Sequence, residues 1–411
     1  MWLPDRIPLL EVAIGDNQRA GQLIKASGYE FRYLDPRPDQ PSVALLMAAK
    51  DKPTWHAGDL FAPMDQNLPE GDLFMRIREL FPKQPLTPMH LLALIGANGI
   101  GRLGYALPDV PAAPSPPPLS REDLLKTAYT PQVFDELVRA YLSTGSGIAG
   151  VQPKIMIPER AAIPIPSLIV KAASASYPGL AANEFLCLTA ARDADILTPT
   201  FALSDDGQLL VLDRFDMLEG NPGCIERLGF EDIAALSGLR VRDALSDRKY
   251  QGSYQRIAEL LGQLQLPQEN MHRFFEQVAF SAMVRNGDAH LKNFGLLYRS
   301  AAEIWLAPMF DVVTTAIYPY ARYEGGPALE DNTLALKLFS GRHQTKTYPT
   351  TDELLAFGRQ VCRVTKPKAV LERIAQGMLK ALGDARGDDR IPGDLLASMG
   401  KAWEKGLAHA A

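Results

Sequence analysis

A proline-rich segment, PDVPAAPSPPPL at residues 108–119, divides this chain into two parts. Proline has no backbone N–H to donate to a sheet and disrupts the interior of a helix, so the segment should form an extended spacer. The full length of 411 residues also exceeds what one hydrophobic core usually supports. We therefore predict an N-terminal domain of residues 1–118 and a second domain of residues 119–411.

The composition is that of a globular protein, with 46% hydrophobic and 22% charged residues. The formal net charge of -5 argues against a protein-wide attraction to nucleic acid or to anionic membranes. Cys187, Cys224 and Cys362 are odd in number and widely spaced, which fits neither a disulfide framework nor a zinc site. The start of the chain does not resemble a signal peptide, and no stretch reaches the roughly 18 apolar residues of a membrane-spanning helix. We expect a cytoplasmic protein.

The spacing of apolar residues predicts an α+β fold. In the first domain, residues 10–24 and 29–36 have the pattern of short strands, and a helical pattern begins at Leu68. A glycine pattern at residues 96–104 reads as a turn between strands. This part of the chain should form a small mixed domain.

The second domain should have two lobes. A helical pattern with N-cap chemistry begins at Ser120 and runs toward Tyr141. Strand patterns follow at residues 154–157, around Lys171 and at residues 208–217, and a helix is expected over residues 180–194. From about residue 230 the periodicity is mostly helical. We predict a strand-rich lobe to about residue 218 and a larger, mainly helical lobe after it.

Two carboxylates and an amide are spaced as phosphoryl transfer requires. NGDAHLKNF, residues 286–294, places Asn293 five positions after Asp288, and LAPMFDVV places Asp311 after an apolar stretch. A carboxylate that orients the nucleophile and oxygen ligands for magnesium are two of the parts this reaction needs. His290 and Lys292 add polar groups between apolar flanks. The alternative is a turn whose polar groups satisfy one another, and we consider the functional interpretation better supported.

Two further segments could bind phosphate. Lys171 lies in the apolar strand SLIVKAA and needs an anion, and Glu184 in the following helix NEFLCLTAA is the natural carboxylate partner. The alternative for Lys171, an edge-strand lysine with its ammonium group in water, is equally compatible with that residue alone. Gly145, Gly147 and Gly150 precede Lys154 in a pattern that lets backbone amides approach phosphate, although a flexible turn would look the same.

Together these segments resemble the HipA-type toxin kinases, bacterial serine/threonine kinases paired with an antitoxin in type II toxin–antitoxin systems. The resemblance covers nearly the whole chain. In the first domain it rests on FAPMDQNLPEGDLFMRI and LLALIGANGIGRLGYAL, and in the second on segments that occur in family order. These are SGIAGVQPKIMI, LIVKAA, ANEFLCLTAA, LDRFDM, ERLGFEDIAALSG, NGDAHLKNFGLLY and LAPMFDVVTT. The second domain is thereby expected to be kinase-like.

The resemblance implies roles for particular residues. Asp288 would be the general base, Asn293 and Asp311 would bind Mg²⁺, and Lys171 would contact the ATP phosphates. The implied nucleotide-binding residues are Ala149, Gly150, Val151, Gln152, Lys154, Lys171, Asp213, Arg214, Phe215 and His290. Asp213 to Phe215 would line the adenine chiefly through the backbone, while Phe215 taken alone is more commonly a core aromatic.

The resemblance also implies partners. The protein substrate would be a translation component such as an aminoacyl-tRNA synthetase, the inhibitor a small helix-turn-helix antitoxin, and DNA contact indirect, through the antitoxin. Two alternatives stay open: a nucleotide-binding interaction module that has lost kinase activity, and a kinase of small molecules or lipids.

Two positions depart from the family pattern. Many relatives carry an autophosphorylated serine where this chain has Gly147, so that modification is absent, shifted to Ser146, or moved to Ser143 or Thr144. Many relatives also have histidine in place of Gly229. The first departure bears on self-inactivation, and the sequence offers no physical account of the second.

Overall fold

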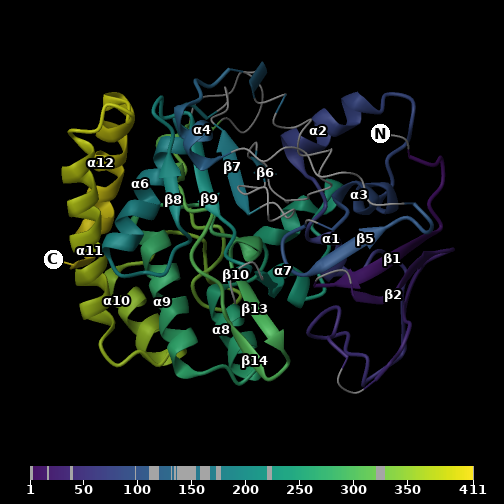
Figure 1. The fold of residues 1–411 in the computed structure, drawn as a ribbon. Helices are drawn as coiled ribbons and strands as arrows, with labels where there is room; N and C mark the ends of the chain where they lie inside the picture. The colour runs from purple at the N-terminus through teal and green to yellow at the C-terminus, as the bar shows by residue number, and fades with distance from the viewer. Residues whose placement is uncertain are drawn as a thin grey trace. The chain divides into compact units, whose positions relative to one another are not determined.

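The computed structural model describes residues 3–15, 18–37, 40–97, 99–110, 120–130, 132–133, 136, 154–157, 167–172, 177–219, 225–320 and 329–410. The chain packs into two compact units, each built from separate stretches of sequence. The first contains Met1–Ala172, Val211–Ser246 and Gly295–Ile304, and the second contains Ala173–Leu210, Asp247–Phe294 and Trp305–Ala411. The predicted domain border near residue 118 adjoins residues outside the described set and stays a prediction. Figure 1 shows the elements along the chain.

The first unit begins with an antiparallel five-stranded sheet in the order β4-β3-β2-β1-β5. Its strands are β1 (Leu9–Ile14), β2 (Gln18–Lys25), β3 (Tyr29–Tyr33), β4 (Thr54–Ala57) and β5 (Leu103–Ala106). Burial alternates along β1, with Leu10, Val12 and Ile14 inside, as expected for a strand with one face on a core. The helices α1 (Ala62–Asp65), α2 (Gly71–Leu80) and α3 (Pro88–Ile95) complete this mixed region.

The rest of the first unit is also rich in strands. It holds α4 (Arg121–Lys126), β6 (Lys154–Ile157), β7 (Leu168–Ala172), β10 (Met217–Glu219), β11 (Ile225–Arg227), β12 (Gly229–Asp232) and α7 (Ile233–Leu236). Strand β13 (Gly295–Ser300) lies wholly in this unit. Strand β9 (Leu209–Asp213) belongs to it from Val211 onward, and β14 (Glu303–Leu306) belongs to it up to Ile304. The β6–β7 pair is antiparallel, with Lys154 opposite Lys171.

Packing explains why residue 229 is a glycine. It pairs with Tyr298 across the β12–β13 ladder, and a Cβ at this position would come within 2.3 Å of the Tyr298 ring. A side chain here would therefore displace the tyrosine. The position of the Tyr298 ring therefore favours glycine at residue 229 of this chain.

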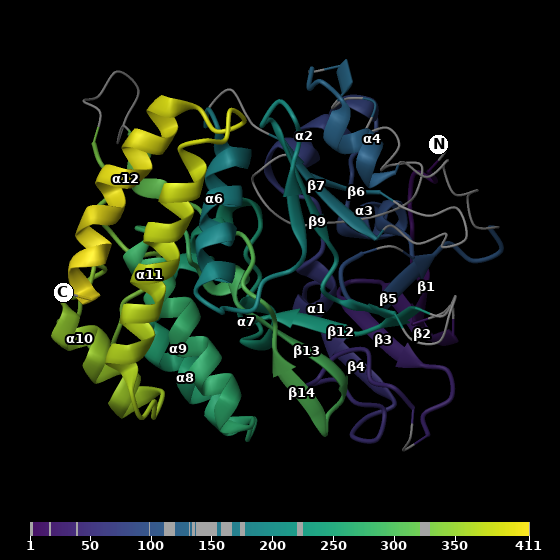
Figure 2. The same ribbon diagram turned by 60° about the vertical axis from the view of Figure 1, so that its left-hand side comes forward.

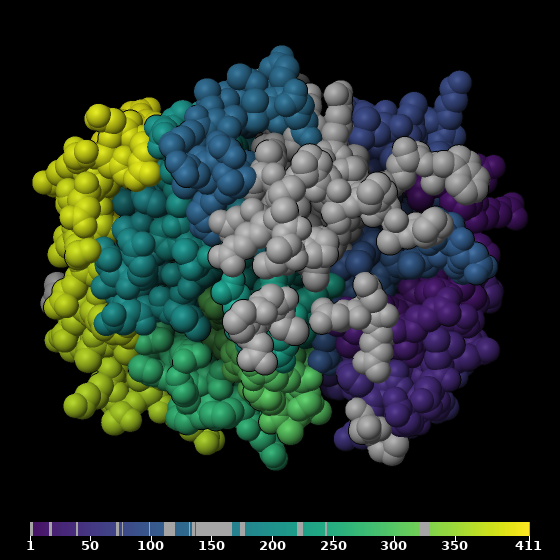
Figure 3. Space-filling model, viewed as in Figure 1, coloured from purple at the N-terminus to yellow at the C-terminus, as the bar shows by residue number. Residues whose placement is uncertain are grey.

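The second unit is mainly helical. It contains α6 (Leu180–Asp193), β8 (Phe201–Leu203), α8 (Tyr254–Gln263), α9 (Gln268–Met283), α10 (Thr351–Ala356), α11 (Pro367–Ala385) and α12 (Gly393–Leu407). Figures 1 and 2 both show α11 beside α6, and in Figure 3 the yellow C-terminal residues lie directly against the teal residues of α6. The two helices approach closely at Gly377, where a Cβ would lie 2.5 Å from the carbonyl oxygen of Ala190.

The predicted α+β fold is confirmed, with strands near residues 154–157, 168–172 and 209–219 and a helix at Leu180–Asp193. Three details differ. The helix capped by Ser120 ends at Lys126, and most of residues 131–141 lie outside the described set. The segment 96–104 connects a helix to a strand, and β12, β13 and β14 form a sheet in a region expected to be mostly helical. Strands β13 and β14 were missed because their apolar runs are too short to separate from helix by periodicity alone. None of the helices in the described ranges is long and apolar enough to cross a bilayer.

Candidate functional site

The site begins in a tight loop that follows α9. The side chain of Asn286 accepts a hydrogen bond from the backbone N–H of Asp288 at 3.0 Å, and the carbonyl oxygen of Asp288 accepts from the backbone N–H of His290 at 2.7 Å. The side-chain amide of Asn293 donates to the same carbonyl oxygen at 2.8 Å. These three bonds fold residues 286–293 back on themselves. Polar groups of residues 286–293 therefore satisfy one another in part, as the alternative interpretation of this turn expected. The Asp288 side chain nevertheless stays 46% exposed.

The glycine at position 287 lets this loop lie close to Thr315 and Asp331. Its backbone N–H donates to the Thr315 hydroxyl at 2.7 Å, and that hydroxyl also donates to the Asp331 carboxylate at 3.1 Å. A Cβ on Gly287 would lie only 2.2 Å from Asp331 Oδ2. The absence of a side chain at position 287 thus lets the segment after Asp311 pack against the loop that carries Asp288.

Asp311 lies beside Asn293, as the spacing predicted. The side-chain amide of Asn293 is 3.5 Å from the carbonyl oxygen of Asp311, a weak contact that nonetheless places the two residues together. Asp311 has a φ of 51°, in the left-handed region that non-glycine residues seldom adopt. A backbone held in such a conformation is often found at functional sites.

The segment after Asp311 is anchored to two helices. Asn183 of α6 accepts a hydrogen bond from the Thr314 N–H at 2.8 Å and donates to the Thr314 carbonyl oxygen at 3.1 Å. Trp403 of α12, fully buried, donates to the Thr314 hydroxyl at 2.8 Å. These bonds fix the backbone three residues beyond Asp311.

The donor set fits Mg²⁺ bound together with phosphate. Asn293 uses its N–H₂ end to bind the main-chain carbonyl oxygen of Asp288, so its own carbonyl oxygen is the end that could face a metal. Oxygen ligands of this kind, few in number and completed by phosphate and water, are typical of nucleotide-bound Mg²⁺. Among the described residues, no group of three or more His, Cys, Asp or Glu side chains could hold a metal unaided.

His290 is held neutral. It is 6% exposed, and burial, followed by the charges of Lys249 and Lys292, lowers its pKa well below the usual value. Its Nε2 is 3.9 Å from Asp288 Oδ1, while its Nδ1 is buried and has no hydrogen-bond partner among the described residues. A neutral imidazole with an unused nitrogen can still form a hydrogen bond to a ligand.

The predicted adenine-lining residues lie in the first unit. Arg214 forms a fully buried ion pair with Asp216 at 2.5 Å, and its backbone N–H donates to the Ser167 carbonyl oxygen at 3.0 Å. The Asp213 carboxylate pairs with Arg121, and the Phe215 ring is 5.5 Å from Phe230. The side chains of these residues thus have structural contacts, and the role implied by the resemblance stays a prediction.

Lys171 and Glu184 are both buried. Lys171 is 3% exposed in β7, which lies between β6 and β9, and Glu184 is 0% exposed in α6. The alternative of a lysine on an edge strand with its ammonium in water is therefore wrong. The two residues belong to different compact units, and their predicted pairing stays a prediction.

The glycine-rich segment lies outside the described residues. This applies to Ser143 through Gln152, which include Ala149, Gly150, Val151 and the possible phosphorylation site Ser146. Lys154 is described only through its place in β6.

Sequence reasoning missed Tyr250, whose hydroxyl donates to Asp288 Oδ1 at 2.6 Å. Tyr250 is 38 positions from Asp288 in the sequence, and no spacing rule connects a lone tyrosine to a particular carboxylate. Its neighbour Lys249 is only 6% exposed, and its charge lowers the pKa of His290.

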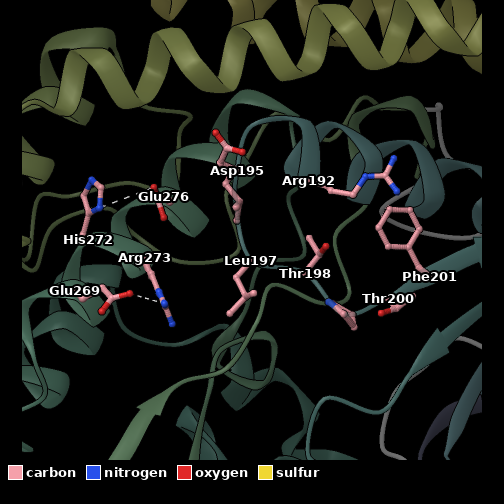
Figure 4. A pocket seen from close by; sticks show the side chains of 12 residues that line it. Arg192, Asp195, Leu197, Thr198, Thr200, Phe201, Glu269, His272, Arg273 and Glu276 are labelled. Atoms are coloured by element: carbon pink, nitrogen blue, oxygen red, sulfur yellow. Dashed lines mark hydrogen bonds and ion pairs between the residues drawn. The ribbon is translucent and has the colours of Figure 1, made fainter.

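A separate hollow of about 650 Å³ lies in the second unit, between the loop after α6 and the N-terminal half of α9. Figure 4 shows its lining side chains, including Asp195, Leu197 and Arg192. Glu269 is paired with Arg273, and Glu276 with Arg373. None of the predicted site residues lines this hollow.

Comparisons with known proteins place the sequence in a family. Residues 10–106 match the HipA N-terminal domain, and residues 146–385 match the HipA-like C-terminal domain. Two proteins of Sinorhizobium fredii with kinase names are similar: Y4dM is 32% identical over 178 residues, and Y4mE is 26% identical over 273 residues. These matches cover 40% of this chain and 40% of Y4dM, and 61% of this chain and 63% of Y4mE. The chain thus spans about half the length of the curated relatives it matches.

A solved structure shares the fold. The HipA chain of a Shewanella oneidensis MR-1 complex of HipA, HipB and operator DNA is 18% identical, with a TM-score of 0.68 over 98% of this chain and 96% of that one. At this identity the likeness establishes the fold. Since a family model covers more than half of the sequence and a second covers most of its N-terminal part, the chain belongs to the HipA family.

Proposed function

We propose that this protein is an ATP- and Mg²⁺-dependent serine/threonine protein kinase that acts as the toxin of a type II toxin–antitoxin system. The observation that carries the proposal is that Asn293 contacts the main chain of both Asp288 and Asp311, in a HipA family member. The Asp288 side chain is 46% exposed, so an acceptor hydroxyl could reach it. Asn293 contacts both Asp288 and Asp311, the other residue proposed to bind Mg²⁺. The kinase names of Y4dM and Y4mE support the same conclusion.

Each residue would have a distinct task. The exposed carboxylate of Asp288 orients the acceptor hydroxyl and takes its proton as the new O–P bond forms and the bond to the ADP leaving group breaks. Asn293 and Asp311 would hold Mg²⁺, which neutralises charge on the phosphates when bound. His290, kept neutral by burial, can hydrogen-bond the nucleotide without changing the charge of the site.

The family suggests the partners. The similar HipA from Shewanella oneidensis was solved together with HipB and operator DNA. By analogy, the inhibitor of this chain would be a small helix-turn-helix antitoxin, DNA contact would be indirect, and the substrate would be a translation component such as an aminoacyl-tRNA synthetase. Growth arrest on expression, relieved by Asp311→Ala and by the antitoxin, is the expected cellular behaviour.

Labelling of cell lysate tests the proposal. The purified protein is incubated with γ-labelled ATP, Mg²⁺ and lysate, alongside Asp288→Asn. We expect labelled protein bands that require Asp288. Label that stays in the lipid or metabolite fraction would instead indicate a kinase of small molecules or lipids. ATP binding by calorimetry without transfer to any fraction would indicate an interaction module that has lost activity.

A further inference from the structure

The hydroxyl of Tyr250 contacts the candidate base directly. It donates to Asp288 Oδ1 at 2.6 Å, within the range of short hydrogen bonds from a hydroxyl to a carboxylate. Both residues belong to the second unit, Tyr250 at the end of the 3-10 helix Asp243–Tyr250 and Asp288 in the loop after α9. One carboxylate oxygen is therefore engaged, while the side chain as a whole stays 46% exposed.

Several contacts hold Tyr250 in place. Its ring meets His290 edge to face at 5.1 Å, and the Lys249 ammonium lies 5.3 Å from the ring centroid. Lys346 lies 5.7 Å from the same centroid and donates to the Tyr250 carbonyl oxygen at 2.7 Å. Both the ring and the backbone of Tyr250 are thus fixed. The hydroxyl approaches Asp288 from a rigid support rather than from a mobile side chain.

Tyr250 also keeps its proton. Burial, followed by the charge of Asp288 and the hydrogen bond to it, raises the pKa of Tyr250 above its usual range. At neutral pH the phenol is therefore a permanent donor. A permanent donor to one oxygen restricts rotation of the carboxylate about its last bond.

We propose that Tyr250 is a positioning residue that holds the Asp288 carboxylate in the orientation in which it accepts the proton of the acceptor hydroxyl. This inference rests on the proposed kinase function, because it concerns the same carboxylate. Two other roles for the contact lead to different results: Tyr250 could block the base as an autoinhibitory plug, or it could only add stability.

Tyr250→Phe removes the hydroxyl and keeps the ring. We expect kcat to fall by roughly 10- to 100-fold, the range for losing a hydrogen bond to a charged group, with KM for ATP within about 2-fold of wild type. The matched control is Tyr318→Phe. Tyr318 is a half-buried tyrosine of the same unit whose hydroxyl donates to the Pro178 carbonyl oxygen at 3.2 Å and accepts from Asn183 at 3.3 Å. A loss of kcat in Tyr250→Phe but not in Tyr318→Phe supports the positioning role.

A double-mutant cycle separates positioning from stability. If Tyr250 acts only through Asp288, adding Tyr250→Phe to Asp288→Asn should lower the residual kcat by less than about 2-fold. An equal loss in both backgrounds would overturn the proposal, as would a higher kcat in Tyr250→Phe, which would identify an autoinhibitory contact.

The same cycle, measured on unfolding, does not depend on activity. Chemical denaturation of wild type, both single variants and the double variant should show coupling between the two positions, because Tyr250→Phe removes the hydrogen bond and Asp288→Asn weakens it by removing the carboxylate charge. Additive effects would overturn the proposal even for an inactive protein. Wild type that transfers no phosphate while the cycle shows coupling would instead refute the proposed kinase function and leave the contact itself established.

Discussion

The side-chain amide of Asn293 donates to the main-chain carbonyl oxygen of Asp288 at 2.8 Å. The residue proposed to bind Mg²⁺ therefore also closes the loop that carries the candidate base. This double role predicts that Asn293 cannot be replaced by another metal ligand without loss.

Asn293→Asp keeps an oxygen ligand but removes the donor, and its carboxylate would face a carbonyl oxygen. We expect kcat to fall by about 10-fold or more, from the lost hydrogen bond and the repulsion. Asn293→Ala should in addition raise the Mg²⁺ concentration at half-maximal rate. Magnesium titrations of the phosphoryl-transfer rate measure both effects. A wild-type rate in Asn293→Asp would show that the loop does not need this bond.

Glu231 makes stability depend on pH. It is buried in β12, where Leu45 N–H and the Tyr298 hydroxyl donate to its Oε1 at 2.6 and 2.9 Å, and its Oε2 has no hydrogen-bond partner among the described residues. Burial, partly offset by those two donors, raises the pKa of Glu231 from 4.5 to about 7. A raised carboxyl pKa favours the protonated form in the folded state, so its stability contribution is present below pH 4.5 and is lost as the pH rises through 7.

We therefore expect wild type to lose about 2–3 kcal/mol of unfolding free energy relative to Glu231→Gln between pH 5 and pH 8. Glutamine keeps the acceptor oxygen and does not ionise. Denaturant unfolding across this pH range is the measurement. Parallel pH curves for the two proteins would show that Glu231 titrates normally.

Arg214 should matter for stability. Its side chain and that of Asp216 are both 0% exposed, and Arg214 also donates to the Gly99 carbonyl oxygen at 2.8 Å. Removing one partner of a buried pair leaves an uncompensated charge, so Arg214→Ala should lower the unfolding free energy by about 3–5 kcal/mol. Arg32→Ala is the control, because the Arg32–Glu30 pair is on the surface and should change stability by less than about 1 kcal/mol. Similar losses in the two variants would contradict this account.

Trp403 should connect the C-terminal helix to the candidate site. Trp403→Phe removes the donor to the Thr314 hydroxyl and leaves a small space in a buried position. We expect a loss of about 1–3 kcal/mol in unfolding free energy. If the contact is the cause, Thr314→Val should be less damaging in the Trp403→Phe background than in wild type. Calorimetric unfolding of the four proteins decides between coupling and independence.

Much of the site could be predicted because its members lie close in sequence. Asp288 and Asn293 occupy one loop, Asp311 follows the strands β13 and β14, and the structure brings Asn293 close to both. Local strands and the helix Leu180–Asp193 were likewise visible as periodic patterns.

The remainder depends on contacts between distant parts of the chain. Tyr250 meets Asp288 across 38 positions, and Leu45 meets Glu231 across 186, and neither pair has a sequence pattern. The ion pair of Arg214 with Asp216 is local, but its burial comes from packing and could not be read from the residues.

The central claim, that Asp288 is the base of a phosphoryl transfer, is tested most directly by comparing the transfer rate from γ-labelled ATP in wild type and Asp288→Asn. Asparagine keeps the size of the side chain and cannot take the proton. The account predicts a folded variant with a rate roughly 100- to 10,000-fold lower, the usual contribution of a general base. Equal rates in the two proteins would contradict it.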